Sequence, residues 1–449
     1  MTTASFVLLA WAWLQAPAPA PFAHPDIAQG PESFTKTVLA SDLVNPWDIS
    51  WGPDGFIWVT ERVGRRITRI NPADGSKHVA VTIPDVTQTH QQDGLLGLAI
   101  HPGLLTAAGP RHVYVSLTYD ADAGATVASR MAIRRYTFDA IAGTLSNPED
   151  VLTGLPAGRD HVSGRLAFGR DGRLYLTLGD QGFNQLSLFC QPIHAHELPT
   201  AAEVQARDWR AYQGKVLRME PDGSIPADNP MFGGVRSHVY STGHRNAQGL
   251  AVARDGQIYA SEHGPSMDDE LNRIQAGRNY GWPFVAGYRD DRLYTYNNWS
   301  ASAPAPCSTL KYTELVAPAS VPQQKETAWN DPMFTPPIRT FFTAPEGFDI
   351  RTQGNATIAP SGIDVYSVPG GGIPGWSDSV LVTSLIRGVV YRVRLGPGGT
   401  TTTGPSFEYF RQRSRYRDVL VSPDGRTIYV AVDGGAENPG SILAFRYAG

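Results

Sequence analysis

A histidine and an aspartate flank one short segment of the chain in an order that suits proton transfer. His161 stands just ahead of the run RLAFGRDGRLYLTLGD, and Asp180 closes that run. The run alternates apolar and polar residues on both sides of Asp171-Gly172, which predicts two strands joined by a tight turn. The outer ends of such a hairpin open on the same side of a sheet, so we expect His161 and Asp180 within hydrogen-bond distance. A carboxylate on one imidazole nitrogen makes the other a general base, and a purely structural histidine is the alternative.

Arginines stand at the starts of two other predicted strands. Arg245 and Asn246 precede the run GLAVARDGQIYASE, where a planar guanidinium donor suits an anionic or carbonyl-bearing ligand. Arg415 and Arg417 are two residues apart, so on a strand they point to one face and can clamp a carboxylate. The alternatives are an arginine that binds loop carbonyls in the first case, and a salt bridge beside a surface arginine in the second.

The acidic run Asp268-Asp269-Glu270 offers oxygen ligands of the kind that a hard cation such as Ca²⁺ prefers. Its spacing is not that of an EF-hand, and a solvated acidic turn is the alternative. The chain has no glycine-rich dinucleotide fingerprint between a strand and a helix, no P-loop lysine and no serine nucleophile elbow. No histidine and cysteine spacing suggests zinc. Nicotinamide, nucleotide, serine-hydrolase and zinc chemistry therefore lack support in the sequence.

The composition favours many short strands joined by turns. Glycine (46) and proline (35) are frequent among the 449 residues, and 41% of the chain is hydrophobic, enough for a large core. The formal net charge is −4, and the sequence contains no run of lysine and arginine. Binding to nucleic acid or to an anionic membrane surface is therefore not expected.

One pattern recurs along the chain: an alternating apolar run, a turn, and a second alternating run. A hairpin with one apolar face cannot bury that face alone, so neighbouring copies must stack around an axis. Six copies predict an all-β, six-bladed β-propeller of four-stranded antiparallel sheets, with the ligand site at the axis on the loop face. We expect the long, turn-rich stretches Phe183–Tyr212 and Ala286–Phe342 to form loops over that face. The copies centre on or end at Asp54-Gly55, Gly103, Asp171-Gly172, Asp255-Gly256, Gly371 and Asp424-Gly425.

The N-terminus has the features of a secretory signal. Phe6–Leu14 is an apolar run followed by Ala-Pro-Ala-Pro-Ala, and it is too short to span a bilayer, which needs about 20 residues. We interpret residues 1–24 as a signal peptide and residues 25–449 as one catalytic domain that is periplasmic or secreted. A disordered or packed N-terminus is the alternative, and no later segment reaches transmembrane length. Cys190 and Cys307 either pair in an oxidising compartment or remain two thiols.

Several segments, taken in order, make the chain resemble the soluble glucose dehydrogenases that use pyrroloquinoline quinone (PQQ) and their aldose sugar dehydrogenase relatives. The likeness runs from about residue 35 to the C-terminus, and the family fold is a six-bladed propeller. The matching segments are Gln92–Gly97, Asp160–Leu166, Gly179–Leu186, Tyr212–Arg218, Gly243–Asn246, Glu262–Glu270, Asn279–Pro283 and Arg415–Asp418.

The resemblance implies a role for each matching residue. His161 corresponds to the general base that takes the proton of the anomeric hydroxyl, Asp180 to its orienting partner, and Arg245 to the residue that stabilises charge on the quinone oxygen. The other implied positions are cofactor contacts at Asn246, Thr357, Arg415 and Arg417; sugar contacts at Gln92, Asp160 and Gln185; a catalytic Ca²⁺ held by the carbonyls of Gly264 and Pro265; and structural Ca²⁺ ligands, some through backbone oxygen, at Glu270, Tyr280, Ala286, Tyr288, Asp290 and Glu326.

Three positions depart from the family pattern. Thr352 and Asn355 stand where the family has a tyrosine and a tryptophan, and the cysteines of that stretch are missing from the sequence. Ile386 stands where a cofactor-binding lysine is expected, and the neighbouring Arg387 would point to the opposite face if both lay on a strand. We therefore expect PQQ binding to be weakened and the sugar preference to be altered.

The resemblance thus implies a PQQ- and Ca²⁺-dependent oxidoreductase that converts an aldose to its lactone by hydride transfer to PQQ, and then reduces an acceptor outside the protein. One alternative is a calcium-dependent, lactonase-type propeller, which would need carboxylates and asparagines around a single Ca²⁺ at the axis. The other is a non-catalytic, ligand-binding propeller with an impaired PQQ site. The sequence leaves open the sugar, the electron acceptor and the choice between monomer and homodimer.

Overall fold

The computed structural model describes residues 26–449 except 123, 125, 314–315, 369 and 371. The predicted signal peptide, residues 1–24, lies outside these residues. Within them, no helix combines the length and the apolar character needed to cross a membrane. The α-helices of this part are short: α1 spans Ala201–Ala206 and α2 spans Ile350–Gln353.

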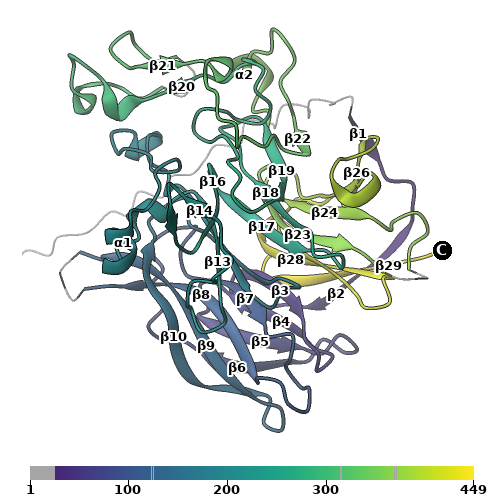
Figure 1. The fold of residues 1–449 in the computed structure, drawn as a ribbon. Coiled ribbons are helices and arrows are strands. Elements are labelled where there is room, and N and C mark those ends of the chain that lie inside the picture. Colours follow the sequence, from purple (N-terminus) through teal and green to yellow (C-terminus); the bar gives the residue numbers. More distant parts are fainter. Residues whose placement is uncertain (1–25, 123, 125, 314–315, 369, 371) are drawn as a thin grey trace, which may run out of the picture.

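Six sheets form the blades of a propeller (Figure 1). Each of the four clearest repeats supplies the two innermost strands of one blade, and each of the two weaker copies includes the innermost strand of another. Blades 1 to 3 contain, from the axis outward, β3 (Pro46–Trp51), β4 (Ile57–Glu61), β5 (Arg66–Ile70) and β6 (Lys77–Thr82); β7 (Leu95–Ile100), β8 (His112–Asp120), β9 (Ser129–Asp139) and β10 (Thr144–Pro156); and β11 (Ser163–Phe168), β12 (Leu174–Leu178), β13 (Lys215–Met219) and β16 (Val239–Thr242). Blades 4 to 6 contain β17 (Ala247–Val252), β18 (Ile258–Glu262), β19 (Asp269–Ile274) and β22 (Arg339–Phe341); β23 (Pro360–Tyr366), β24 (Ser379–Ser384), β25 (Val390–Arg394) and β26 (Ser406–Tyr409); and β27 (Ser414–Val421), β28 (Thr427–Gly435), β29 (Ser441–Tyr447) and β2 (Phe34–Ala40).

Strands near the N-terminus complete the last two blades. β2 pairs antiparallel with β29, so both ends of the chain contribute to one sheet and close the ring. β1 (Ile27–Gln29) adds to β26 in parallel and makes blade 5 five-stranded, where four strands were expected. A strand of three residues is too short to show an alternating pattern, which is why the sequence did not reveal it.

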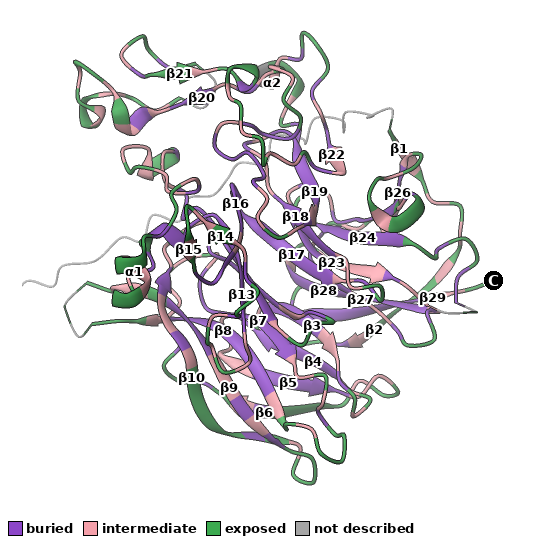
Figure 2. Cartoon of the chain, in the orientation of Figure 1, coloured by how far each residue is buried: buried purple, intermediate pink, exposed green. Residues whose placement is uncertain are grey.

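The buried apolar side chains gather between the blades rather than at one centre. Figure 2 shows the buried strands inside and the exposed turns and loops outside. Six hydrophobic clusters of the described residues each join two neighbouring blades. Between blades 1 and 2, for example, Trp58 and Ile67 pack with Val113, Leu117 and Phe138. This stacking buries the faces that isolated hairpins would expose to water.

Glycines in the innermost strands allow the blades to approach one another around the axis. The inner strands pack as a closed ring in the order β3, β7, β11, β17, β23 and β27. A side-chain carbon on Gly97 would overlap the carbonyl oxygen of Gly164 in the next blade, and one on Gly249 would overlap that of Ser361. The pairing register shifts at these places, so the inner strands carry bulges near their starts. Bulges of this kind re-aim side chains and are common beside functional sites.

Arg165 fills the axis between the inner strands. Its Nη1 lies 2.8 Å from the Asp48 carboxylate of blade 1 and 2.8 Å from the Asp418 carboxylate of blade 6. Its guanidinium also lies over the ring of Trp47, 4.2 Å from the centroid. Burial raises the pKa of Asp418 to about 7. One cation therefore ties three blades together across the axis.

The two long stretches after β12 and β19 form loops that a disulfide joins. Cys190 in the first loop pairs with Cys307 in the second, with Cα atoms 5.6 Å apart and a sequence separation of 117 residues, which resolves the choice that the sequence left open. A loop of this length contributes roughly 4–5 kcal/mol in the chain-entropy model. The short elements of these loops and of the turn before β16 are η1 (Leu186–Leu188), α1, η2 (Arg210–Tyr212), β14 (Met231–Phe232), β15 (Val235–Arg236), β20 (Tyr296–Asn297), η3 (Trp299–Ala301), η4 (Cys307–Thr309), β21 (Gln323–Gln324) and η5 (Glu326–Ala328); η6 (Pro397–Gly399) joins β25 to β26.

The second long stretch differs from the expectation at its end. The expected loop Ala286–Phe342 includes β22, the outermost strand of blade 4, which pairs with β19. Only three residues of β22 join the sheet, so the sequence contains no alternation long enough to predict it.

Candidate active site

The predicted base and its partner meet at the axial end of blade 3. His161 Nδ1 lies 2.6 Å from Asp180 Oδ1, and both side chains are buried. Asp180 also accepts hydrogen bonds from the backbone N–H of Gly182 at 2.8 Å and from the ring N–H of Trp282 at 2.8 Å. A side-chain carbon on Gly179 would overlap the carbonyl oxygen of His161, so a glycine at this position allows the close approach. The hairpin brings the two side chains together as predicted.

Gln185 connects this pair to Arg245. Its Nε2 donates to Asp180 Oδ2 at 3.3 Å, and its Oε1 accepts from Arg245 Nη2 at 2.7 Å. Arg245 also stacks over Trp282 at 5.2 Å and donates to the carbonyl of His263 at 3.3 Å. Its Nε is buried and has no partner among the described residues. A buried guanidinium with an unused donor suits an anionic or carbonyl-bearing ligand.

Glu262, to which the sequence analysis gave no role, holds the backbone of Arg245 and Asn246. Its Oε1 accepts the N–H of Arg245 and, at 3.2 Å, the N–H of Asn246. Its Oε2 lies 2.9 Å from Nδ1 of His244, whose ring stacks on Tyr280. The hydroxyl of Tyr280 donates a hydrogen bond to a backbone carbonyl. If Tyr280 binds Ca²⁺ as predicted, it would therefore use its backbone oxygen.

Asp433 occupies the predicted carboxylate clamp. Its two oxygens lie 2.8 Å from Arg417 Nε and 3.0 Å from Arg415 Nε, so the two arginines share a face but clamp a carboxylate of the protein itself. Arg417 also donates to Gln248 Oε1 at 3.0 Å, and Gln248 donates to Asn246 Oδ1 at 2.9 Å. Burial, reinforced by the neighbouring Arg415, lowers the pKa of Arg417 to about 10. These contacts connect blade 6 to blade 4.

Arg62 is a further buried cation that the sequence analysis missed. Its Nη1 donates to the carbonyls of His90 and Asp93 at 3.1 and 2.9 Å. Its Nε is buried without a partner in the described part of the chain. Burial lowers the pKa of Arg62, and the positive charge of Arg415 lowers it further.

The predicted sugar contacts Gln92 and Asp160 border the same place. Gln92 donates to Asp160 Oδ1 and accepts from Asn246 Nδ2 at 3.4 Å. Asp160 Oδ1 lies 3.9 Å from His161 Nε2. Gln185 and Asp160 thus border the histidine ring, and Gln92 borders Asp160, so hydrogen-bonding groups gather beside the predicted base. We call the hydrogen-bonded and ion-paired set, together with Arg62, the axial network: Arg62, Gln92, Asp160, His161, Asp180, Gln185, Arg245, Asn246, Gln248, Arg415, Arg417 and Asp433.

Asp269 holds two loops beside the axial network. Its Oδ2 accepts from the hydroxyl of Thr357 and the N–H of Ile358, both at 2.6 Å, and its Oδ1 accepts the N–H of Gly264 at 2.9 Å. Burial raises the pKa of Asp269 to about 6. Both oxygens of Asp269 thus position Gly264 and Thr357. The run 268–270 is buried, so the alternative of a solvated acidic turn is wrong, and cation binding by this run stays a prediction.

The residues on either side of Asp269 belong to a group of carboxylates, three of them buried and one, Asp290, partly exposed. We call this group the acidic cluster: Asp268, Glu270, Asp290 and Glu326. Burial raises the pKa of Asp268 well above its usual value, and Glu326 and Asp290 raise it further. Burial likewise raises the pKa of Glu270, and that of Glu326 to about 7. Asp268 Oδ1 is buried without a hydrogen-bond partner among the described residues.

The loop at 286–291 wraps around the acidic cluster with its backbone N–H groups. Ala286 and Asp291 donate to Glu326 at 3.0 and 2.9 Å, and Gly287 donates to Glu270 at 2.7 Å, while Tyr288 is partly exposed. No three His, Cys, Asp or Glu side chains of the described residues are arranged to hold a metal ion. The acidic cluster is therefore a concentration of negative charge, not a closed coordination sphere.

The family departures lie at the edge of the site, and one expectation about them is wrong. Ile386 and Arg387 lie in the turn after β24, so the rule that adjacent strand residues face opposite ways does not apply. Arg387 donates Nε and Nη2 to the carbonyl of Thr357 at 3.3 and 3.2 Å, whereas Ile386 is 56% exposed. Thr352 and Asn355 are exposed in and after α2. A cation thus borders Thr357 although the expected lysine is replaced.

His263 is another residue that the sequence analysis left unassigned. Its Nε2 lies 2.7 Å from the carbonyl of Pro360, so the ring proton sits on Nε2. Burial lowers the pKa of His263 well below its usual value, and Arg245 and His161 lower it further. The ring is therefore neutral beside the axial network.

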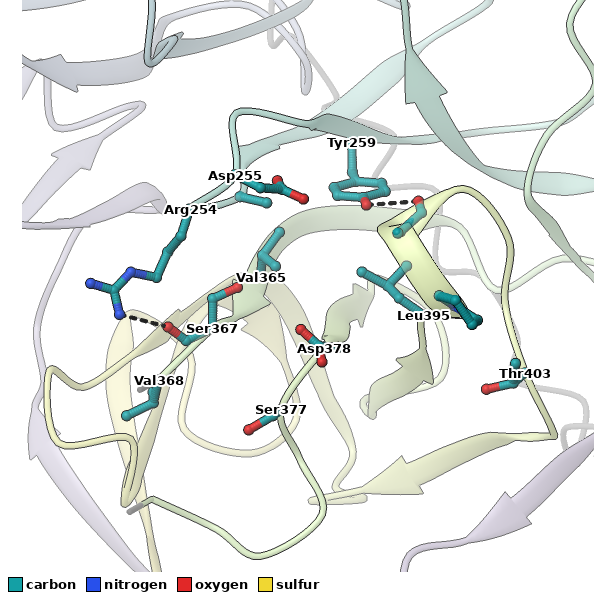
Figure 3. Close-up of a pocket in the computed structure, with 15 residues that line it drawn as sticks. Arg254, Asp255, Tyr259, Val365, Ser367, Val368, Ser377, Asp378, Leu395 and Thr403 are labelled. Carbon is teal, nitrogen blue, oxygen red and sulfur yellow. Dashed lines mark hydrogen bonds between the residues drawn. The ribbon is translucent and has the colours of Figure 1, made fainter. Parts of the chain in front are cut away.

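A separate cavity of about 640 Å³ lies at the hairpin-turn ends of blades 4 and 5 (Figure 3). Arg254 donates there to the carbonyl of Ser367 at 3.5 Å, and Tyr259 donates to that of Gly399 at 2.8 Å. Arg254 and Ser367 follow the ends of the inner strands β17 and β23, whereas the axial network surrounds the starts of these strands. None of the axial residues lines this cavity, so it is not part of the candidate active site.

Comparison with known proteins agrees with this arrangement. The model of the family described as Glucose / Sorbosone dehydrogenase matches residues 43–335 and 337–444. The chain belongs to this family. Quinoprotein glucose dehydrogenase B of Acinetobacter calcoaceticus is 41% identical over 440 residues, which cover 93% of this chain and 91% of that protein. The PQQ-bound form of aldose sugar dehydrogenase from Streptomyces coelicolor aligns with a TM-score of 0.63 and 26% identity, covering 93% of this chain and 99% of that one. Because dehydrogenases are oxidoreductases, the protein is an oxidoreductase of the glucose/sorbosone dehydrogenase family.

Proposed function

We propose that the protein oxidises an aldose sugar at the anomeric carbon to the lactone, with PQQ as the hydride acceptor and His161 as the general base. The observation that carries this proposal is the 2.6 Å contact between His161 and Asp180, joined through Gln185 to the buried guanidinium of Arg245. PQQ, when bound, supplies an ortho-quinone that accepts a hydride.

The proton-transfer step follows from the hydrogen bonds of His161. In the neutral ring Nδ1 carries the proton that is donated to Asp180, so Nε2 has a free lone pair. Nε2 takes the proton of the anomeric hydroxyl, and Asp180 stabilises the resulting imidazolium. Trp282 and Gln185 hold the second oxygen of Asp180 and so keep the carboxylate in place. Gln92, Asp160 and Gln185 offer partners to the other sugar hydroxyls.

The axial network fits an anionic quinone with three carboxylates. Arg62, Arg245, Arg415 and Arg417 bring guanidinium groups to one end of the axis, and the buried Nε atoms of Arg62 and Arg245 are unused in the described structure. Arg245 and Asn246 would hold the quinone end, and Arg415 and Arg417 would hold carboxylates. Thr357, with Arg387 beside it, would border the same group.

Calcium is proposed at two places. The carbonyls of Gly264 and Pro265 would hold a catalytic ion; a side-chain carbon on Gly264 would overlap the carbonyl of Met267, so only glycine allows this tight turn. The acidic cluster, with backbone oxygens of Tyr280, Ala286 and Tyr288, would hold a structural ion. Buried carboxylates that repel one another, one with an unpartnered oxygen, fit a divalent cation.

The location of the protein is proposed from the N-terminal sequence, and an electron acceptor outside the protein is proposed with it. A signal over residues 1–24 would export the protein to the periplasm or the medium, and the reduced enzyme would there pass electrons to an external acceptor. The lactonase alternative would need carboxylates gathered around one Ca²⁺ at the axis. In the axial network, Asp180 is instead paired with His161, and Asp433 with Arg415 and Arg417.

Reconstitution tests the proposal directly. Purified protein is loaded with PQQ and Ca²⁺, and reduction of an electron-accepting dye is measured with a panel of aldoses. We expect sugar-dependent reduction that needs PQQ and is lost in His161→Ala. Absence of reduction with every aldose, despite bound PQQ, would exclude the proposed reaction.

A further inference from the structure

A second pocket, of about 540 Å³, lies outside the axial network between blade 2 and the first long loop. Arg130 on β9 lines it together with Arg159 ahead of β11, and Arg207 and Arg210 after α1. Four arginines at one pocket are a strong local concentration of positive charge in a chain whose formal net charge is −4. Such a concentration attracts anions.

Most of this positive charge is not neutralised within the described residues. Arg210 is paired with Asp208, at 2.9 Å. Arg130, Arg159 and Arg207 are exposed and form no ion pair in the described part of the chain. The Arg210 side chain holds the pKa of Asp208 below its usual value, and Arg130 contributes to the same effect. The pocket therefore retains a surplus of guanidinium donors.

The other walls of the pocket offer hydrogen-bond acceptors and an apolar surface. Gln181 and Gln213 line it, both are more than nine-tenths buried, and the amide oxygen of each has no partner among the described residues. The Gln181 amide is oriented by the bond from its Nε2 to the carbonyl of Gly179 at 3.0 Å. Phe183 and Trp209 supply the apolar part. Acceptors, guanidinium donors and an aromatic wall together suit a ligand with hydroxyls, an acid group and a carbon skeleton.

We propose that this pocket binds a sugar acid, with its carboxylate on the arginines and its hydroxyls on the amide oxygens of Gln181 and Gln213. Two sources have this chemistry. An aldonate forms when the lactone of the proposed reaction hydrolyses, and this source rests on the proposed function. A uronic acid unit of an acidic saccharide does not depend on it.

The pocket shares two segments of chain with the axial network. Arg159 directly precedes Asp160, and Gln181 directly follows Asp180. Substitutions for the test are therefore placed on Arg130 and Arg207, which lie away from these segments. Arg207 has a left-handed backbone with φ of 56°, so asparagine, which tolerates this conformation, is the suitable replacement.

Calorimetry on the full, disulfide-bonded protein at low ionic strength tests the proposal without PQQ or turnover. Sodium gluconate, sodium galacturonate, glucose and sodium acetate are titrated separately. We expect one or both sugar acids to bind, and acetate to bind more weakly than the sugar acid. Any binding of glucose, an aldose that the axial network is proposed to accept, should be the same in the pocket variants and the wild type. Tighter gluconate identifies the hydrolysed product as the source, and tighter galacturonate identifies an acidic saccharide.

The variants Arg130→Ala and Arg207→Asn should each weaken sugar-acid binding by about three- to tenfold, since the lost contacts are charge-assisted but partly exposed. Arg254→Ala, which removes an exposed arginine from the separate cavity of Figure 3, is the matched control and should leave binding unchanged. Melting temperatures equal to that of the wild type show that the variants fold. The proposal is overturned if neither sugar acid binds, if acetate binds as tightly, or if Arg254→Ala weakens binding as much as the pocket variants. If the protein shows no oxidation activity, this binding test still applies, because calorimetry does not require turnover.

Discussion

The axial network and the acidic cluster both bury ionisable side chains, but they balance their charges in different ways. In the axial network, Asp180 lies 2.6 Å from His161, and Asp433 lies within 3.0 Å of two arginines. In the acidic cluster, Glu326 accepts only backbone N–H groups, and one oxygen of Asp268 has no partner in the described structure. Positive charge is in excess at the first place and negative charge at the second.

This contrast indicates ligands of opposite sign for two neighbouring regions. A buried charge without a partner costs several kcal/mol unless a ligand or a proton compensates it. The positive charge of the axial arginines is balanced only in part by Asp433. A bound anion would supply the remaining negative charge. The carboxylates of the acidic cluster take up protons more readily, as the raised pKa of Glu326 shows, until a cation replaces those protons.

The largest effect should come from removing the base of the axial network. His161→Ala should lower turnover by about 10²–10⁴, the usual contribution of one general base, while PQQ still binds in a calorimetric titration. His263→Gln is the control, because glutamine keeps a donor for the carbonyl of Pro360 and should reduce turnover far less. Turnover like that of the wild type in His161→Ala would remove this histidine from the mechanism.

Removal of calcium should act on the acidic cluster through stability. Since the pKa of Glu326 is raised from 4.5 to about 7 in the metal-free fold, the folded state binds protons that the unfolded state releases. The associated stability is present below about pH 4.5 and is lost as the pH rises through 7. At pH 8, Ca²⁺ at 100 times its dissociation constant should restore about 2.7 kcal/mol, seen as a higher melting temperature than in chelator.

The matched variant for the calcium experiment is Glu326→Gln. It should flatten the pH dependence of the melting temperature and reduce the stabilisation by Ca²⁺. Identical melting curves in chelator and in Ca²⁺ at pH 8 would show that the acidic cluster binds no calcium.

A smaller effect is expected from removing one of the two arginines, Arg415 and Arg417, that form the clamp in the axial network. Arg415→Ala should raise the dissociation constant of PQQ by about three- to tenfold, because a charge-assisted contact is lost from a side chain that is partly exposed. Asp433 keeps Arg417 as its partner, so the fold should be preserved. Arg413→Ala, at an exposed arginine two residues away that pairs with Glu437, should leave PQQ affinity unchanged, and an equal loss in both variants would argue against the clamp.

The smallest effects should arise at the turn that carries the family departure. Arg387→Ala should weaken PQQ binding and Ile386→Lys should strengthen it, each by about two- to threefold, because charges at exposed or half-buried positions contribute under about 1 kcal/mol. The gain in Ile386→Lys should decrease with added salt. Unchanged affinity in both variants would place the cofactor away from this turn and restrict the anion site to the axial arginines.

Local sequence predicted the parts of the structure that depend on neighbours in the chain. The Asp-Gly turns, the paired inner strands and the contact between His161 and Asp180 all follow from one hairpin at a time, because chain connectivity leaves such a hairpin few other arrangements. The recurrence of the hairpin then predicted the number of blades. A further signal went unused: the four clearest repeats end in an acid, namely Glu61, Asp180, Glu262 and Asp433.

Only the tertiary structure decided what those acids and the other charged side chains contact. The hairpin of β27 and β28 places Asp433 beside Arg415 and Arg417, and the closed ring brings Gln248 of blade 4 to Arg417. Asp269 accepts a hydrogen bond from Thr357, and Cys190 pairs with Cys307, because the packing of the blades and their loops brings together segments that are about 90 to 120 residues apart. The alternation of residue types sets which face of a strand is buried, but it contains no information on the angle between blades or on the bulges at Gly97, Gly164 and Gly249. Those distances, and with them the sign of the charge left over at each site, are fixed by packing around the axis.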